Sequence, residues 1–175
     1  MAIFGVPTHL VEIAQEPMVR GIEEGVVRFM DGPKWILIAD DDPNDRFLIG
    51  RLIKEGGVDQ ELVYARDGYD VLDCLHQQGR FVDRPEGRPA VVILDHQMPG
   101  LSGLEILGRI RSDPEFDLIP VVIHSGQMLP REVRQAYRLG ANAYVEKPVN
   151  YEDLRRVFKE LGVFWCQVNV VACEA

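Results

Sequence analysis

The chain has 175 residues, 46% of them hydrophobic, which is enough to build one domain around a buried core. Its formal charge of −9 argues against non-specific nucleic-acid binding, because neutralising phosphates requires a basic surface. No apolar run approaches the roughly 18 residues of a membrane span, and the N-terminus lacks the basic start and continuous apolar core of a signal peptide. We therefore expect a cytoplasmic protein that contacts neither membrane nor nucleic acid.

The cysteines are too few and too scattered to define a disulfide framework or a zinc site. There are three of them, an odd number, and none forms a CxxC pair. Free thiols are the expected state of Cys74, Cys166 and Cys173.

Residues 1–33 differ in pattern from the rest of the chain. Apolar residues recur there at three- and four-residue intervals up to a break at Asp31-Gly32-Pro33, which indicates one or two amphipathic helical pieces. Gly21 and Gly25 weaken this helical pattern. The segment is either a partly disordered leader or an extension that packs on the main domain or on a second copy.

From residue 34 to residue 160 short apolar runs alternate with amphipathic stretches. The apolar runs predict five strands, at 35–39, 61–65, 90–95, 121–124 and 143–145. The amphipathic stretches predict five helices, at 43–55, 69–79, 104–112, 130–139 and 150–160.

Five strand-then-helix units predict an α/β fold. Such short crossovers require parallel strands with helices on both faces of the sheet. Right-handed crossovers then favour a doubly wound, flavodoxin-like sheet in the order 2-1-3-4-5. In that order the ends of the first and third strands are neighbours.

Polar residues capable of chemistry follow four of the five expected strands. Three acids begin at Asp40, and Asp95, Ser125 and Lys147 stand at the carboxyl ends of the third, fourth and fifth strands. Each alone could be a turn or capping residue. Together they form one cluster at the carboxyl edge of the sheet, where adjacent carboxylates favour a shared divalent cation such as Mg²⁺.

The stretches that carry these residues resemble the receiver domain of two-component response regulators. They are ILIADDDPND, VVILDHQMPGLSG, IPVVIHSG and ANAYVEKP, in the order and spacing of that family over about 34–160. The resemblance implies a phosphorylation switch without classical enzyme activity, which promotes its own phosphotransfer and slow dephosphorylation.

By this resemblance Asp95 accepts the phosphoryl group from a histidine kinase. Asp40 and Asp41 belong to the acid pair that organises Mg²⁺, with Asp95 and the backbone carbonyl of Gln97 as further ligands. Lys147 pairs with the phosphoryl group, and the family's peptide bond at Lys147-Pro148 is typically cis.

The resemblance also implies how phosphorylation is transmitted. Ser125 is the hydroxyl residue that follows the phosphoryl group, and Tyr144 is the switch aromatic. Gln97 and Gln127 hold positions that tune hydrolysis of the acyl phosphate. His96 and His124 lack the spacing of a metal pair and are interpreted as packing or loop residues.

Residues 161–175 form an apolar tail that is too short for a DNA-binding or catalytic output domain. We expect output through a downstream protein target and, because the tail and residues 1–33 are apolar, a homodimer. A tail folded back on its own domain is the alternative. Phe164-Trp165 is also similar to the ends of regulators that serve bacterial phytochrome-type histidine kinases.

Two other functions compete with the receiver hypothesis. A Mg²⁺-dependent phosphatase of the haloacid-dehalogenase type would use Asp40 as nucleophile and Asp42 as the second acid. Its expected Thr or Val is Asn44 here, and no cap domain is available. A flavodoxin-like cofactor binder would need a phosphate loop after the first strand, which the sequence lacks.

Overall fold

The computed structural model describes residues 35–170. The expectations for residues 1–34 and 171–175 lie outside that range. Within it, no helix is long and apolar enough to cross a membrane.

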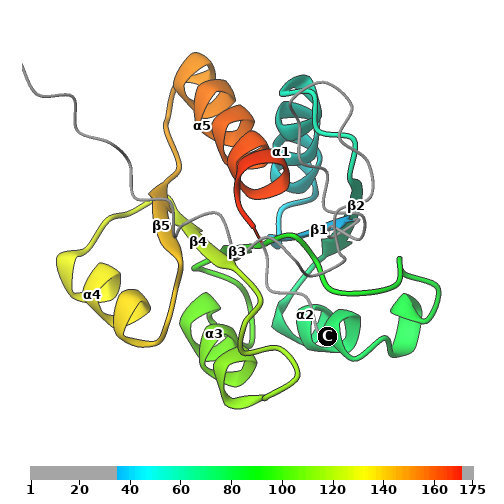
Figure 1. Cartoon of the computed structure of the whole chain (residues 1–175). Coiled ribbons are helices and arrows are strands. Elements are labelled where there is room, and N and C mark those ends of the chain that lie inside the picture. The colour runs from blue at the N-terminus through cyan, green and yellow to red at the C-terminus, as the bar shows by residue number, and fades with distance from the viewer. Residues whose placement is uncertain (1–34, 171–175) are drawn as a thin grey trace, which may run out of the picture. The chain divides into compact units, whose positions relative to one another are not determined.

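Five strands and five α-helices alternate along the described chain (Figure 1). The strands are β1 Trp35–Ala39, β2 Glu61–Ala65, β3 Val92–Asp95, β4 Val121–Ser125 and β5 Ala143–Glu146. The helices are α1 Pro43–Glu55, α2 Gly68–Leu75, α3 Gly103–Ser112, α4 Pro130–Arg138 and α5 Tyr151–Val163. Two short helical turns complete the chain, η2 Gly79–Phe81 and η3 Phe164–Val168.

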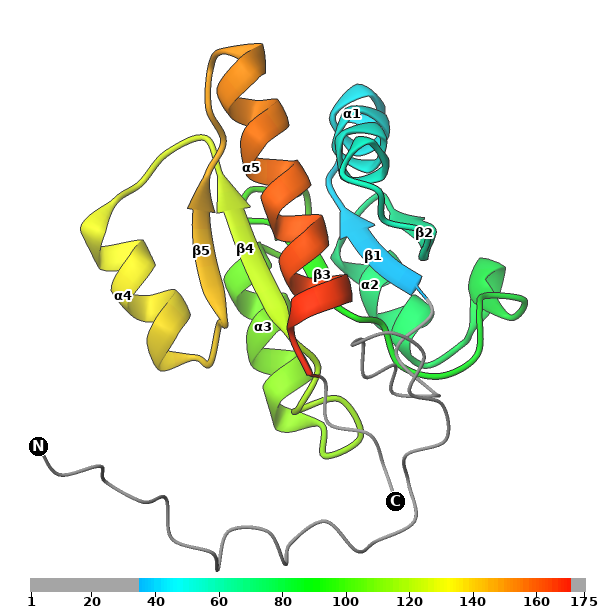
Figure 2. The ribbon, with the colours of Figure 1, turned by 45° about the horizontal axis from the view of Figure 1, so that its top comes forward.

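The strands form one parallel sheet in the order β2-β1-β3-β4-β5, which confirms the predicted topology. Figure 2 shows the arrowheads of β1, β4 and β5 pointing toward the same end of the molecule. Ala39 pairs with Leu94 in the register of β1 and β3, so the loops that follow these strands begin side by side. This edge of the sheet carries the site.

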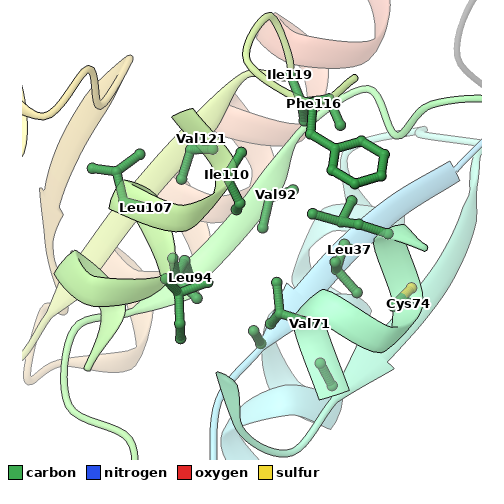
Figure 3. Close-up of a cluster of buried hydrophobic side chains, with 14 of the residues drawn as sticks. Leu37, Val71, Cys74, Val92, Leu94, Leu107, Ile110, Phe116, Ile119 and Val121 are labelled. Carbon is green, nitrogen blue, oxygen red and sulfur yellow. The ribbon is translucent and has the colours of Figure 1, made fainter. Parts of the chain in front are cut away.

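Helices cover both faces of the sheet, with α1 and α5 on one face and α2, α3 and α4 on the other (Figure 1). Successive residues of β1 therefore enter different cores, because side chains alternate along a strand. Leu37 packs beneath α2 and α3 with the residues drawn in Figure 3, whereas Ile36 and Ile38 pack beneath α1 and α5. A strand buried on both faces explains the unbroken apolar runs in the sequence.

Helix α2 ends four residues before its predicted end at residue 79. His76 is its C-cap, and Gln77 and Gly79 both have positive φ values, 54° and 56°. A left-handed residue such as Gln77 stops helical hydrogen bonding. The apolar spacing that suggested a longer helix therefore runs into a turn before η2.

Helix α5 continues past the predicted boundary at residue 160 and runs directly into the π-helical turn η3. Trp165 is buried in the core beneath α1 and α5, and Gln167 Nε2 donates to the carbonyl of Gly57 at 3.0 Å. Residues 161–168 thus pack on their own domain.

Candidate phosphoryl-transfer site

Two buried carboxylates stand at the adjacent ends of β1 and β3. Asp40 is 1% exposed and Asp95 is 6% exposed, although both are charged side chains. Their inner oxygens are held by local backbone groups: the N–H of Asp42 donates to Asp40 Oδ1 at 2.9 Å, and the N–H of Gln97 donates to Asp95 Oδ1 at 3.1 Å. The outer oxygens of both carboxylates face the end of β5.

Lys147, which follows β5, bridges these two carboxylates. Its Nζ lies 2.7 Å from Asp40 Oδ2 and 2.9 Å from Asp95 Oδ2. The backbone N–H of Lys147 donates to the carbonyl of Ser125 at 2.8 Å, which continues the pairing of β5 with β4 and fixes the base of the lysine. Three strands therefore bring one ammonium and two carboxylates together, as the sequence predicted.

Burial and ion pairing shift the pKa values of Asp40 and Lys147 in opposite directions. Burial raises the pKa of Asp40 to about 6, while the hydrogen bond and charge of Lys147 oppose the rise. Burial would lower the pKa of Lys147, but hydrogen bonds to Asp40 and Asp95 raise it above its ordinary value. Lys147 thus carries its positive charge at neutral pH.

The acids also fit a divalent metal ion. One carboxylate oxygen from each of Asp40, Asp41 and Asp95 can be chosen so that all three lie within 4.8 Å of one another. Asp41 is exposed and the other two are buried, so the cluster opens to solvent on one side. Oxygen ligands with room for water are the donor set that Mg²⁺ and Mn²⁺ prefer.

The loop after β3 passes close beneath Asp95. The N–H of Gly103 donates to the carbonyl of His96 at 3.0 Å, and a Cβ on Gly103 would overlap the carbonyl oxygen of Asp95. Only glycine permits this close approach. Ser102 and Glu105 then form a capping box that starts α3.

Ser125 and Tyr144 are joined through one residue, Gln127. Ser125, buried at the end of β4, accepts a hydrogen bond at Oγ from the N–H of Gln127 at 3.2 Å. The hydroxyl of half-buried Tyr144 donates to the carbonyl of Gln127 at 3.3 Å. Ser125 and Tyr144 therefore share one hydrogen-bonding neighbour, Gln127.

The chain matches the family model described as "Response regulator receiver domain" over residues 36–159. That span covers the sheet except Trp35, and it includes every site residue from Asp40 to Lys147. The chain belongs to the response regulator receiver domain family. This match confirms the predicted family. Members of the family act mainly as phosphorylation switches.

Named relatives of this receiver domain include phytochrome response regulators. Response regulator Rcp1 from Synechocystis sp. is 33% identical over 135 residues, which cover 77% of this chain and 90% of Rcp1. The structure of the Mn²⁺-bound form of Rcp1 superposes with a TM-score of 0.73 at 31% identity, over 81% of this chain and 100% of the other. The phosphorylated cyanobacterial phytochrome response regulator RcpA superposes with a TM-score of 0.74 at 30% identity, over the same shares.

The phosphatase alternative finds no support in this receiver domain. The family match and the two superposed structures favour the receiver hypothesis over both alternatives.

One expectation about the backbone was wrong. The described residues contain no cis peptide bond, so Lys147-Pro148 is trans here. Bonds to proline favour trans by about 0.5–1 kcal/mol unless the surroundings oppose it.

Sequence reasoning missed two polar neighbours of this receiver site. Asp45, in the first turn of α1, places Oδ2 3.3 Å from Lys147 Nζ. Arg46, the next residue, donates from its guanidinium to the carbonyl of Asp40. Their place in the first turn after β1 was the available signal, because that turn starts at the same edge of the sheet.

The two histidines beside the site are packing residues, as interpreted from the sequence, but each also contacts a charged group. His124 is fully buried against the ring of Phe158, with Nε2 3.9 Å from Asp40 Oδ2. His96 Nε2 lies 3.3 Å from Glu132 Oε2 and so links the β3–α3 loop to α4.

Proposed function

We propose that Asp95 is the phosphoryl acceptor of a switch that signals by changing its contacts with other proteins. The observation that carries this proposal is the position of Lys147 Nζ, 2.9 Å from Asp95 Oδ2 at the open edge of the sheet. The unit that performs this function is residues 34–160, which includes the family match at 36–159.

The reaction we propose is transfer from a phosphohistidine of a kinase. An oxygen of Asp95 attacks phosphorus and the phosphorus–nitrogen bond breaks. The imidazole, which stays on the kinase, is the leaving group and takes up a proton from solvent. Lys147 neutralises charge on the transferring group, while the N–H of Gln97 keeps the other oxygen of Asp95 in place.

We propose Mg²⁺ as the metal, held by Asp40, Asp41, Asp95 and the backbone carbonyl of Gln97. When bound, the ion supplies charge neutralisation for the phosphoryl oxygens. The Mn²⁺-bound form of Rcp1 supports this proposal, since a similar protein holds a divalent ion.

The output we propose begins at Ser125. A phosphoryl group brings roughly −1.5 to −2 charges to the end of β3, and Ser125 reaches it by breaking its bond to the N–H of Gln127. Gln127 then moves, and its carbonyl no longer holds the hydroxyl of Tyr144. Tyr144 turns inward and the surface of α4, β5 and α5 changes. Side chains of Gln97 and Gln127 set the rate at which water removes the phosphoryl group.

We propose a phytochrome-type histidine kinase as the partner, because Rcp1 and RcpA resemble this chain over most of its length and RcpA is a phytochrome response regulator. The downstream target is a protein. A homodimer is the form in which the switch works.

The test is incubation with acetyl phosphate and Mg²⁺, followed by intact mass spectrometry. The wild type should gain one phosphoryl group, and Asp95→Asn should gain none. Continuous release of phosphate without a stable adduct, dependent on Asp40, would contradict the proposal and support a phosphatase.

A further inference from the structure

Lys147 contacts a third carboxylate besides those of Asp40 and Asp95. Asp45 Oδ2 lies 3.3 Å from Lys147 Nζ, against 2.7 Å for Asp40 and 2.9 Å for Asp95. The side chain of Asp45 is 46% exposed, whereas those of Asp40 and Asp95 are 1% and 9% exposed. The contact to Asp45 is therefore the longest and the best solvated of the three.

Asp45 is fixed by the start of α1. Asp42 caps this helix by accepting a hydrogen bond from the N–H of Asn44 at 2.7 Å, and Pro43 occupies the first turn. Arg46, the residue after Asp45, is tied to the carbonyl of Asp40. Asp45 is thus held next to the buried acids.

The three carboxylates use all the donors that Lys147 has. An ammonium group carries three N–H bonds, and hydrogen bonds to Asp40, Asp95 and Asp45 occupy them. A phosphoryl group on Asp95 needs at least one of these donors. The exposed contact to Asp45 costs least to release, because water replaces the lost partner.

We propose that Asp45 is a positioning residue that holds Lys147 in the unphosphorylated state and competes with the phosphoryl group for it. This inference rests on the proposed function. The contact to Asp45 keeps the ammonium group of Lys147 away from the phosphoryl group and so favours the unphosphorylated conformation. Removing the charge of Asp45 should therefore strengthen binding of a phosphoryl group.

The test compares two variants that remove the same unit of charge from the same loop. Asp45→Asn removes the negative charge that faces Lys147. Asp42→Asn removes a charge that has no contact with Lys147 and keeps the helix cap, since Asn caps as well as Asp. Both are titrated with beryllofluoride, a phosphoryl mimic, at saturating Mg²⁺ by isothermal calorimetry. Thermal unfolding checks that both variants fold.

Asp45→Asn should bind the mimic about two- to fivefold more tightly than the wild type, and Asp42→Asn should change the affinity less. A merely structural role would not increase the affinity. Equal changes in the two variants would mean that the lower negative charge of the loop, and not the contact to Lys147, changes the affinity. Weaker binding by Asp45→Asn would mean that Asp45 helps Lys147 to bind the phosphoryl group. Either result overturns the inference. If the wild type binds no mimic and takes up no phosphoryl group, the proposed function fails, which is a separate result.

Discussion

Asp70 is a nearly buried carboxylate that two arginine side chains neutralise. It is 7% exposed and accepts hydrogen bonds from the guanidinium groups of Arg66, at 2.8 Å, and Arg80, at 2.6 Å. Burial alone would raise the pKa of Asp70, but the hydrogen bonds from Arg66 and Arg80 lower it below its usual range. Asp70 thus joins α2 to the turn η2.

The stabilisation by Asp70 should depend on pH. A carboxyl whose pKa is lower in the folded chain stabilises it fully above its ordinary pKa of about 4, and loses this effect as the pH falls further. Asp70→Asn should reduce the free energy of unfolding at pH 7 by about 2 kcal/mol. Urea unfolding should show a smaller difference at pH 3. A difference independent of pH would contradict this assignment.

His124 should make the folded domain less stable than an apolar side chain at the same position would. Neither ring nitrogen meets the full geometry of a hydrogen bond within the described residues, although the ring contacts the backbone of Ala39, and the side chain is fully buried. Burial, together with the charge of Lys147, lowers its pKa to about 3 and keeps the ring neutral. His124→Leu should therefore raise the free energy of unfolding by about 1 kcal/mol, measured in urea. A loss of stability would show that the contacts of the ring with Asp40 and with the backbone of Ala39 outweigh this cost.

Some residues of the site could be predicted from the sequence and others could not. Asp40, Asp95 and Lys147 could be found because each stands at the carboxyl end of a predicted strand. Asp45 could not, since its contact depends on the direction of a side chain in the first turn of α1. That direction follows from the helix cap and not from any spacing.

At the scale of elements, boundaries set by apolar runs were predicted well, and boundaries set by turns were not. β1, α1 and β2 agree with prediction because their apolar residues end where the elements end. α2 ends early at the left-handed Gln77, a conformation rare for residues other than glycine. α5 runs on into η3 because Trp165 adds buried contacts beyond residue 160.

The extension η3 should contribute to stability through one of its two aromatic residues. Trp165 is 8% exposed and packs in the core beneath α1 and α5, whereas its neighbour Phe164 is 46% exposed. Trp165→Ala should lower the free energy of unfolding by about 3 kcal/mol, and the control Phe164→Ala by less than about 1 kcal/mol. Equal losses in chemical denaturation would mean that η3 does not pack as described.

At the scale of the whole molecule, the topology followed from sequence pattern alone. Five alternating units and the right-handed crossover rule left the order 2-1-3-4-5 as the simplest sheet, and the structure has that order. The clustering of Asp40, Asp95 and Lys147 then required no knowledge of side chains, because parallel strands end at one edge. Side-chain partners inside that cluster required the structure.

Oligomeric state is the property of the whole molecule that the switch should control. Phosphorylation is proposed to change the surface of α4, β5 and α5, where Tyr137 and Tyr151 are exposed. Light scattering with Mg²⁺ should show a dimer whose proportion changes when beryllofluoride is added. If the measured molar mass is the same with and without beryllofluoride, a change of oligomeric state is not the output.

The role of Asp95 as phosphoryl acceptor can be tested by locating the phosphoryl group chemically. Borohydride reduces an acyl phosphate on aspartate to homoserine, which peptide mass spectrometry can place in the sequence. After treatment with acetyl phosphate and Mg²⁺, we predict homoserine at position 95 and at no other aspartate. Homoserine at position 40 or 41 instead, or an unmodified Asp95, would contradict the assignment of Asp95 as the phosphoryl acceptor.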